Sequence, residues 1–236
     1  MATRRPPVRT RSTPTRPRRM PEKHVVAAGE AGFPVVGIGA SAGGLEAFRR
    51  LIAAIPARSG MSFILVQHLD PTHASMMANL LTAHTAMTVV EARQGLRLER
   101  NHVYIIPPGR YRAVHNGALH LSRPPQADPR QTVRMPFDFL FQSLVEEFGE
   151  RAVCVVLSGT GTDGTVGARM VKGAGGLVIA QDPDEAEYDG MPRSAIEAGA
   201  VDLVLPLHEM PKAIAKYAGH RYVQNGKSKA GLPPGE

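Results

Sequence analysis

The chain has 236 residues, of which 43% are hydrophobic, 21% charged and 5% aromatic, with 24 glycines, 20 prolines and a net charge of +7. This length fits one domain with tails, and the composition excludes a chain that is collagen-like or disordered throughout. No apolar segment approaches the ~18 residues of a membrane span, and no apolar run follows the N-terminal arginines as a secretory signal requires.

The positive charge is concentrated at the two ends of the chain. Residues 1–32 hold eight Lys or Arg against two Glu, and residues 221–236 hold three against one, which leaves residues 33–220 with a net charge of −1. The proline- and arginine-rich segment 1–32 is predicted to be a disordered basic arm, and 221–236 a flexible C-terminal tail. Because the body is nearly neutral, no specific nucleic-acid binding is expected.

From Phe33 onward, short aliphatic runs alternate with segments of helical spacing. In chain order, the pattern predicts a strand at 34–38, a helix at 45–55, a strand at 62–67, a helix at 72–83, a helix at 136–148, a strand at 152–157, a helix at 165–172, a strand at 177–180, a helix at 193–198, a strand at 201–205 and a helix at 208–217. Short apolar strands that alternate with helices indicate a doubly wound α/β fold, with a mainly parallel sheet and helices on both faces.

One stretch departs from this alternation. Three strand-like runs follow one another without a helix, at 102–106, 110–114 and 118–122, and the dipeptide Asn116-Gly117 between the last two is a strong hairpin signal. The sequence therefore predicts an antiparallel hairpin excursion near 102–122. The proline-containing segment that follows, 123–135, is predicted to be a surface loop.

The remaining chemical groups give few signals. The only cysteine, Cys154, lies in the apolar run 152–157 and is interpreted as a buried structural thiol in a reduced, cytoplasmic protein. The histidines lack metal-ligand spacing, so no metal is expected, and no other cofactor is predicted. The acidic run at 182–189 is interpreted as a solvated loop.

The sharpest local feature is the segment 35–45, in which a strand ends in small residues and leads into a helix. Glycines at such a junction let backbone amides approach a phosphate, as in dinucleotide sites. Alternatively, residues 39–43 match G-x-S-x-G, where small neighbours permit a tight turn that projects the Ser41 hydroxyl. A third interpretation is a glycine turn that serves only helix packing.

The spacing favours the serine turn over the dinucleotide site. The third glycine of G-x-G-x-x-G would fall at position 42, which is Ala42, a variant that some dinucleotide sites tolerate. An acidic residue should also end the second strand to bind a ribose hydroxyl. That strand instead ends in Gln67 and His68, with Asp70 two residues beyond.

Three residues with the chemistry of a catalytic triad follow the carboxyl ends of predicted parallel strands, where ligands bind in open α/β sheets. Ser41 follows the first strand, His68 the second, and Asp163 the strand that ends at Leu157. A serine hydroxyl needs a base to take its proton, and the base needs a third group to orient it. Taken singly, each residue has a structural alternative: a helix cap for Ser41, a strand-end structural histidine for His68, and a turn or N-cap for Asp163.

Five motifs occur in a familiar order along residues 33–217. They are GIGASAGG at 37–44, VQH at 66–68, YIIPPG at 104–109, LSGTGTDG at 157–164 and GMPRSAI at 190–196. Together they resemble the catalytic domain of the CheB-type protein-glutamate methylesterases. On this resemblance, we interpret residues 33–220 as a CheB-type methylesterase domain.

The resemblance implies a serine hydrolase that demethylates glutamate methyl esters on chemoreceptors and, in some members, deamidates receptor glutamines. It assigns Ser41 as nucleophile, His68 as general base and acid, and Asp163 as the orienting carboxylate. The oxyanion would be held by the backbone amides of Ala42 and Thr160. The family often has Thr and Met at these last two positions, which leaves the amides themselves in place. A methylated receptor would be the partner, with a CheR-type methyltransferase as the functional counterpart.

Several alternatives stay open from the sequence alone. Family members often carry a phosphorylatable receiver ahead of the catalytic domain, and segment 1–32 is far shorter than the ~100 residues such a domain needs. Residues 181–190 also resemble CheB-type domains found beside methyltransferase domains, which suggests a signalling substrate outside chemotaxis. A nucleotide-binding or adaptor module with the same fold is the alternative of another class. An α/β-hydrolase esterase is disfavoured because that fold places its histidine last, whereas His68 precedes Asp163.

Overall fold

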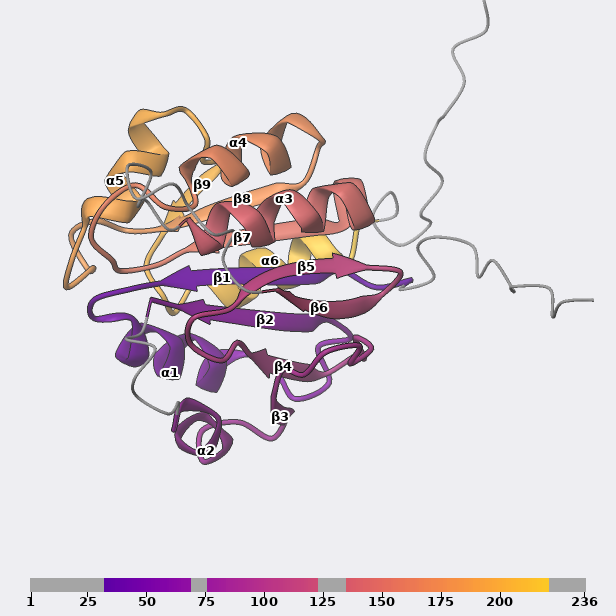
Figure 1. The fold of residues 1–236 in the computed structure, drawn as a ribbon. Helices are drawn as coiled ribbons and strands as arrows, with labels where there is room; N and C mark the ends of the chain where they lie inside the picture. Colours follow the sequence, from indigo (N-terminus) through magenta and orange to yellow (C-terminus); the bar gives the residue numbers. More distant parts are fainter. Residues whose placement is uncertain (1–31, 69–75, 123–134, 221–236) are drawn as a thin grey trace, which may run out of the picture.

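The computed structural model describes residues 32–68, 76–122 and 135–220 (Figure 1). The predicted basic arm, the C-terminal tail, most of the surface loop at 123–135 and the start of the helix at 72–83 lie outside these described residues. Within them, the expected alternation of strands and helices is present, and the chain forms two sheets.

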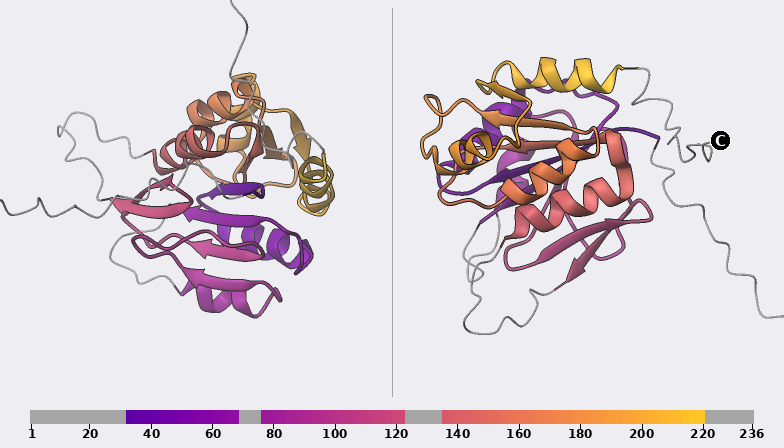
Figure 2. Two further views of the ribbon diagram at one scale, coloured as in Figure 1. Left: turned by 90° about the vertical axis from the view of Figure 1, so that its right-hand side faces the viewer. Right: turned by 90° about the horizontal axis from the view of Figure 1, so that it is seen from above.

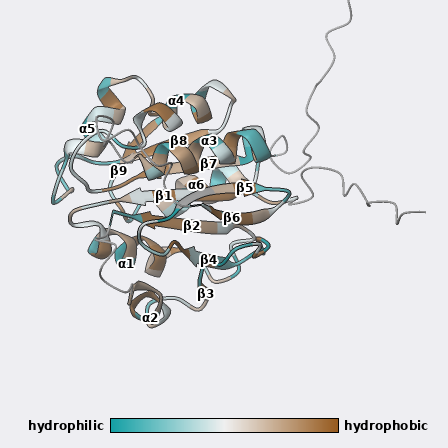
Figure 3. Cartoon of the chain, viewed as in Figure 1, coloured by the Kyte–Doolittle hydropathy of each residue, from teal (hydrophilic) through white to brown (hydrophobic). Residues whose placement is uncertain are grey.

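A seven-stranded sheet forms the centre, in the order β3-β4-β2-β1-β7-β8-β9. All of its neighbouring strands pair in parallel. Its strands are β1 (Val35–Ala40), β2 (Ser62–Gln67), β3 (Thr88–Glu91), β4 (His102–Ile105), β7 (Ala152–Val156), β8 (Leu177–Gln181) and β9 (Leu203–Leu205). The predicted mainly parallel, doubly wound sheet is therefore confirmed, and Figure 3 shows hydrophobic residues along β2, an inner strand of this sheet.

Two apolar clusters fix the helices to opposite faces of this sheet. One cluster joins the sheet to α1 (Gly44–Ala54), α2 (Met77–Thr82) and α6 (Met210–Ala218). The other joins it to α3 (Pro136–Phe148), α4 (Thr165–Gly173) and α5 (Gly190–Glu197), with the short 3₁₀ turn η1 (Gly149–Arg151) after α3. Figure 2, right, shows α6 and α3 on opposite sides of the strands. Burial of both faces explains why the central strands are apolar throughout.

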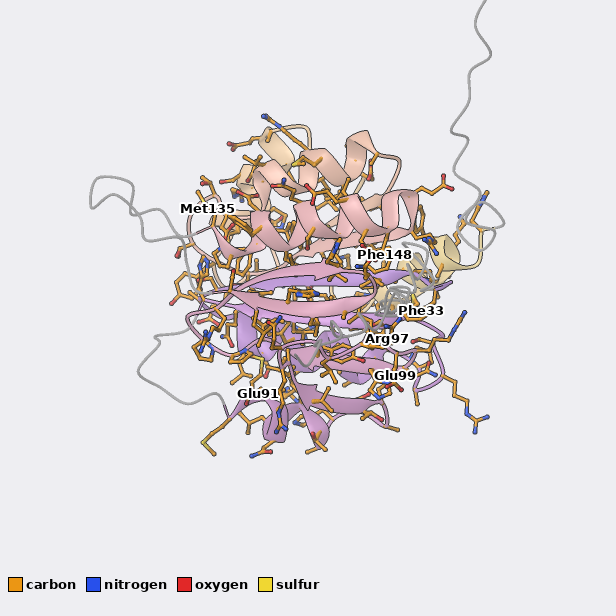
Figure 4. All side chains as sticks on the ribbon, turned by 45° about the vertical axis from the view of Figure 1, so that its right-hand side comes forward. Phe33, Glu91, Arg97, Glu99, Met135 and Phe148 are labelled. Atoms are coloured by element: carbon orange, nitrogen blue, oxygen red, sulfur yellow. The ribbon has the colours of Figure 1, made fainter. Side chains whose placement is uncertain are left out.

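The antiparallel excursion is a two-stranded hairpin of β5 (Tyr111–His115) and β6 (Ala118–Ser122). Its turn residues Asn116 and Gly117 both have positive φ, 51° and 68°, as a two-residue hairpin requires. The hairpin runs alongside α3, whose ends are marked by Met135 and Phe148 in Figure 4, and the Gly117 amide donates to Glu147 on that helix at 2.8 Å. The structure corrects one boundary: β4, predicted within the excursion, pairs in parallel with β2 and β3.

Helix α3 lies so close to β1 that the strand needs glycine at the contact. A Cβ built on Gly39 would lie 2.8 Å from the Cγ atom of Phe137. For Gly39, the interpretation that the glycines of segment 35–45 serve helix packing is therefore supported. This close contact places the first turn of α3 next to the carboxyl ends of β1 and β2, where the predicted site residues lie.

Two further expectations concern burial and membranes. Cys154 is fully buried in β7, and burial raises the pKa of its thiol well above the ordinary value. Its interpretation as a buried structural thiol is confirmed. Among the described helices, none combines the length and the apolar character that crossing a bilayer demands.

Candidate active site

The predicted nucleophile lies in a tight turn between β1 and α1. The Ser41 amide donates to the carbonyl of Ser158 at 2.9 Å, and the Ser41 carbonyl accepts from the amide of Gly44 at 2.9 Å. Gly43 precedes α1 with φ of 72°, a left-handed conformation that suits glycine. Ser41 lines an open cleft of about 560 Å³ together with His68.

His68 follows β2 at the same edge of the sheet, where the arrowheads of β1 and β2 end side by side in Figure 1. Its amide donates to the carbonyl of Ala40 at 3.2 Å. Its ring stacks on Phe137, with centroids 4.4 Å apart and planes 17° apart. The backbone contact and the ring stack together restrict the orientation of the imidazole, whose side chain is 31% exposed.

Asp163 lies in the loop between β7 and α4, and its carboxylate is 3% exposed. Oδ2 accepts from the amide of Phe137 and Oδ1 from the amide of Asp138, both at 3.1 Å. These are unpaired amides of the first turn of α3, so Asp163 caps a helix that begins before it in the chain. The predicted capping role is real, but it serves α3, while Gly164 occupies the N-cap of α4.

The buried carboxylate also contacts the imidazole. Nε2 of His68 lies 2.9 Å from Oδ2 of Asp163, although its direction is off the line of a hydrogen bond. Catalytic hydrogen bonds are often loose without substrate and tighten when it binds. The structure thus joins two of the three predicted triad residues directly, and places Ser41 in the same cleft without a hydrogen bond to the His68 ring among the described residues.

The two backbone amides predicted to hold an oxyanion belong to peptides that are fixed through their carbonyls. The Ser41 carbonyl accepts from Gly44, and the Gly159 carbonyl accepts from the amide of Met191, both at 2.9 Å. Because N–H and C=O of a trans peptide point in opposite directions, the amides of Ala42 and Thr160 point away from these contacts. In the described part of the chain, neither amide donates a hydrogen bond.

The loop after β7 approaches Ser41 so closely that it requires glycine. A Cβ built on Gly159 would lie 2.2 Å from Sδ of Met191 and 3.0 Å from Cβ of Ser41. Gly159 therefore allows the loop that carries Thr160 to pass between the nucleophile and α5.

Ser158 connects three loops and was not singled out by the sequence. Its hydroxyl donates to the Ala42 carbonyl at 2.9 Å and accepts from the amide of Tyr188 at 3.0 Å. Its own amide donates to the side chain of Gln181 at 2.8 Å. Both side chains are buried, so this network fixes the nucleophile turn against the loop between β8 and α5. The motif at 157–164 was the one signal that pointed to this loop.

A second carboxylate lies behind Asp163. Asp138 accepts from the amide of Gly167 at 2.7 Å and so ties α3 to α4. Burial raises the pKa of Asp138; the Gly167 bond acts against this, and the nearby charge of Asp163 adds to it. Arg193, in the motif at 190–196 at the start of α5, pairs with Asp189 at 2.5 Å on the surface and does not line the cleft.

Comparison with known proteins identifies the family of this chain. The family model described as CheB methylesterase matches residues 36–214. The chain belongs to the CheB methylesterase family. The CheB methylesterase catalytic domain of Thermotoga maritima is similar in structure, with a TM-score of 0.71 and 32% identity over 78% of this chain and 98% of that one.

Curated relatives of this CheB-family chain are longer than it is. The protein-glutamate methylesterase/protein-glutamine glutaminase 2 of Anaeromyxobacter dehalogenans is 38% identical over 180 residues, which are 76% of this chain and 52% of that protein. An uncharacterized 104.1 kDa protein of Rhodobacter capsulatus is 44% identical over 141 residues, which are 60% of this chain and 14% of that protein. The chain thus spans about half or less of these relatives.

Proposed function

We propose that this CheB-family chain is a serine hydrolase that removes the methyl group from glutamate methyl esters on a signalling protein. The observation that carries the proposal is the contact of His68 with the buried, helix-capping Asp163, in a cleft that Ser41 also lines. A dinucleotide site would need an acidic side chain at the end of β2, but β2 ends at Gln67 and His68 follows it.

In the first half-reaction, Oγ of Ser41 attacks the carbonyl carbon of the ester, and its proton passes to His68. Since Nε2 faces Asp163, Nδ1 is the nitrogen left for this proton. Asp163 then stabilises the imidazolium that forms. The amides of Ala42 and Thr160 would donate to the developing oxyanion, where charge appears only in the transition state.

Collapse of the tetrahedral intermediate breaks the bond to the methoxy oxygen, which takes the proton from His68 and leaves as methanol. The glutamyl group is now esterified to Ser41. A water molecule loses a proton to His68 and attacks this ester, and the second collapse returns the proton to Ser41 and releases glutamate. The relatives are named for a glutaminase as well; attack on a glutamine amide would follow the same steps and release ammonia.

The partners follow from this chemistry. We infer that the substrate is a methylated chemoreceptor, that a CheR-type methyltransferase adds the group that this chain removes, and that both act in the cytoplasm. A methylated signalling protein outside chemotaxis would serve the same site.

The proposal is tested by methanol release from methylated receptor membranes. Ser41→Ala should lower the rate by more than about 10³-fold, since a triad without its nucleophile retains little activity. Ser59→Ala is the matched control, because Ser59 precedes β2 at the opposite edge of the sheet and bonds only locally, to the amide of Met61. Unchanged methanol release from the Ser41→Ala protein would contradict the mechanism.

A further inference from the structure

A carboxylate from the acidic loop at 182–189 lies in the cleft. Glu187, between β8 and α5, lines the cleft with Ser41 and His68. A Cβ built on Gly43 would lie 2.8 Å from Oε2 and 2.9 Å from Cβ of Glu187. The side chain therefore lies against the turn that follows the nucleophile, and the prediction of a merely solvated loop is incomplete for this residue.

The backbone next to Glu187 is held by two hydrogen bonds of Tyr188. The Tyr188 amide donates to the hydroxyl of Ser158 at 3.0 Å, and the Tyr188 carbonyl accepts from the amide of Gly159 at 2.9 Å. Ser158 in turn holds the Ser41 amide and the Ala42 carbonyl. The loop after β7 thus forms hydrogen bonds both with the nucleophile turn and with Tyr188, the residue next to Glu187.

The cleft has a second acidic residue, whose charge is compensated. Glu46 accepts from Nε of Arg49 at 2.7 Å, and this bond lowers the pKa of Glu46. Glu187 has no ion-pair partner among the described residues. Of the carboxylates that line the cleft, Glu187 is therefore the one whose negative charge is not offset by a neighbour.

This charge has opposite consequences for substrate and product. The free amides of Ala42 and Thr160 and the N-terminus of α1 all attract a negative charge near Ser41. The ester and the amide are neutral, but hydrolysis leaves a glutamate carboxylate that these same groups would retain. The negative charge of the exposed Glu187 side chain on the cleft wall opposes that retention, because like charges repel across short distances.

We propose that Glu187 is a specificity-determining residue that selects the neutral ester over the free carboxylate and thereby promotes product release. The proposal rests on the proposed esterase function. It assigns to the cleft wall a preference for uncharged glutamyl derivatives that neither Ser41 nor His68 supplies.

The test compares the binding of two versions of one short helical peptide, with a glutamate γ-methyl ester or a free glutamate at the same position. Binding is measured on proteins that carry Ser41→Ala, so that neither peptide is consumed. We expect the ester peptide to bind more tightly, and Glu187→Gln to reduce this preference by about twofold to tenfold. At about 1 M salt the preference should largely disappear in the parent protein as well, because the cleft is open to solvent.

Glu46→Gln is the matched control, since it removes a paired carboxylate from the same cleft and should change the preference much less. An equal change in both variants, an unchanged preference in Glu187→Gln, or binding of neither peptide would overturn the role of Glu187. Methanol release from the ester peptide by the wild-type protein is measured in parallel. Release with an unchanged preference refutes only the role of Glu187, whereas absence of release refutes the proposed function itself.

Discussion

The two halves of the candidate active site are held in different ways. In the acid–base half, side chains make the decisive contacts: Asp163 binds the first amides of α3, and the His68 ring stacks on Phe137. In the nucleophile half, backbone groups make most of them: the Ser41 amide and the carbonyls of Ser41 and Gly159 are each fixed by another backbone atom. The Ser158 hydroxyl adds a side-chain contact with the Ala42 carbonyl.

Because of this difference, each half should be sensitive to a different kind of substitution. The acid–base half depends on the identity of its side chains, and it can be damaged by changing one polar atom. The nucleophile half depends on where its peptides lie, and it should be damaged by adding a single carbon atom where the chain passes closely. Substitutions in each half therefore test whether the two halves depend on different features.

Among the substitutions that compare the two halves, Asp163→Asn is expected to have the largest effect. An amide in place of the carboxylate cannot stabilise the imidazolium of His68 and leaves only one oxygen for the two α3 amides. We expect kcat for methanol release to fall by about 10²- to 10⁴-fold, and the free energy of unfolding to fall by about 1–3 kcal/mol because one buried amide loses its acceptor. Steady-state kinetics and urea unfolding measure the two effects.

Asp184→Asn provides the control for Asp163→Asn, because Asp184 lies exposed in the loop after β8. If Asp163→Asn kept nearly full activity, Asp163 would be only a helix cap. The catalytic triad would then lack its third member.

Gly159→Ala should disturb the nucleophile half by adding one methyl group. The new Cβ would overlap Sδ of Met191 and press on Cβ of Ser41, so the loop must shift and carry the Thr160 amide with it. We expect kcat to fall by about 10²-fold, as when one oxyanion donor is lost, with the triad side chains unchanged.

A Met191→Ala background distinguishes the two contacts of Gly159. Without the Met191 side chain, the added methyl group has room on one side, so Gly159→Ala should destabilise the protein less than it does alone. The contact with Ser41 persists, so most of the loss in kcat should persist as well. Full recovery of kcat in the double variant would show that Ser41 is not displaced.

Much of the fold could be predicted because local patterns and tertiary contacts agree. The apolar runs of β2 and β7 and the Asn116-Gly117 turn mark their elements in the sequence. Strand β3 was not predicted because it is four residues long with Thr88 and Glu91 exposed at its ends. The parallel pairing of β4 with β2 and β3 was missed because three strand-like runs follow one another there without a helix, a pattern that indicates antiparallel strands.

The site was predictable where strand ends determine it. Ser41 and His68 follow neighbouring parallel strands, so topology alone brings them to one edge. The positions of Phe137, Ser158 and Glu187 depend on how α3 and two loops pack, which no local pattern records. The sequence indicates Asp163 only by its chemistry, because its capping of α3 is a tertiary contact that no local pattern records.

The smallest effect concerns Asp138 and is a pH dependence of stability. Burial raises the pKa of Asp138 above its ordinary value of 3.8, so the folded protein binds more protons than the unfolded chain. A raised acid pKa contributes stability that is complete below the ordinary pKa and is lost as pH rises through the raised pKa.

Asp138→Asn removes this titration and keeps an oxygen that can accept from Gly167. The free energy of unfolding of the variant, relative to that of the wild type, should therefore increase from about pH 4 upward and level off above the raised pKa. Urea unfolding at several pH values measures the difference, and methanol release should change little, because Asp163 keeps both of its amide donors. A difference that is constant with pH would show that Asp138 titrates normally.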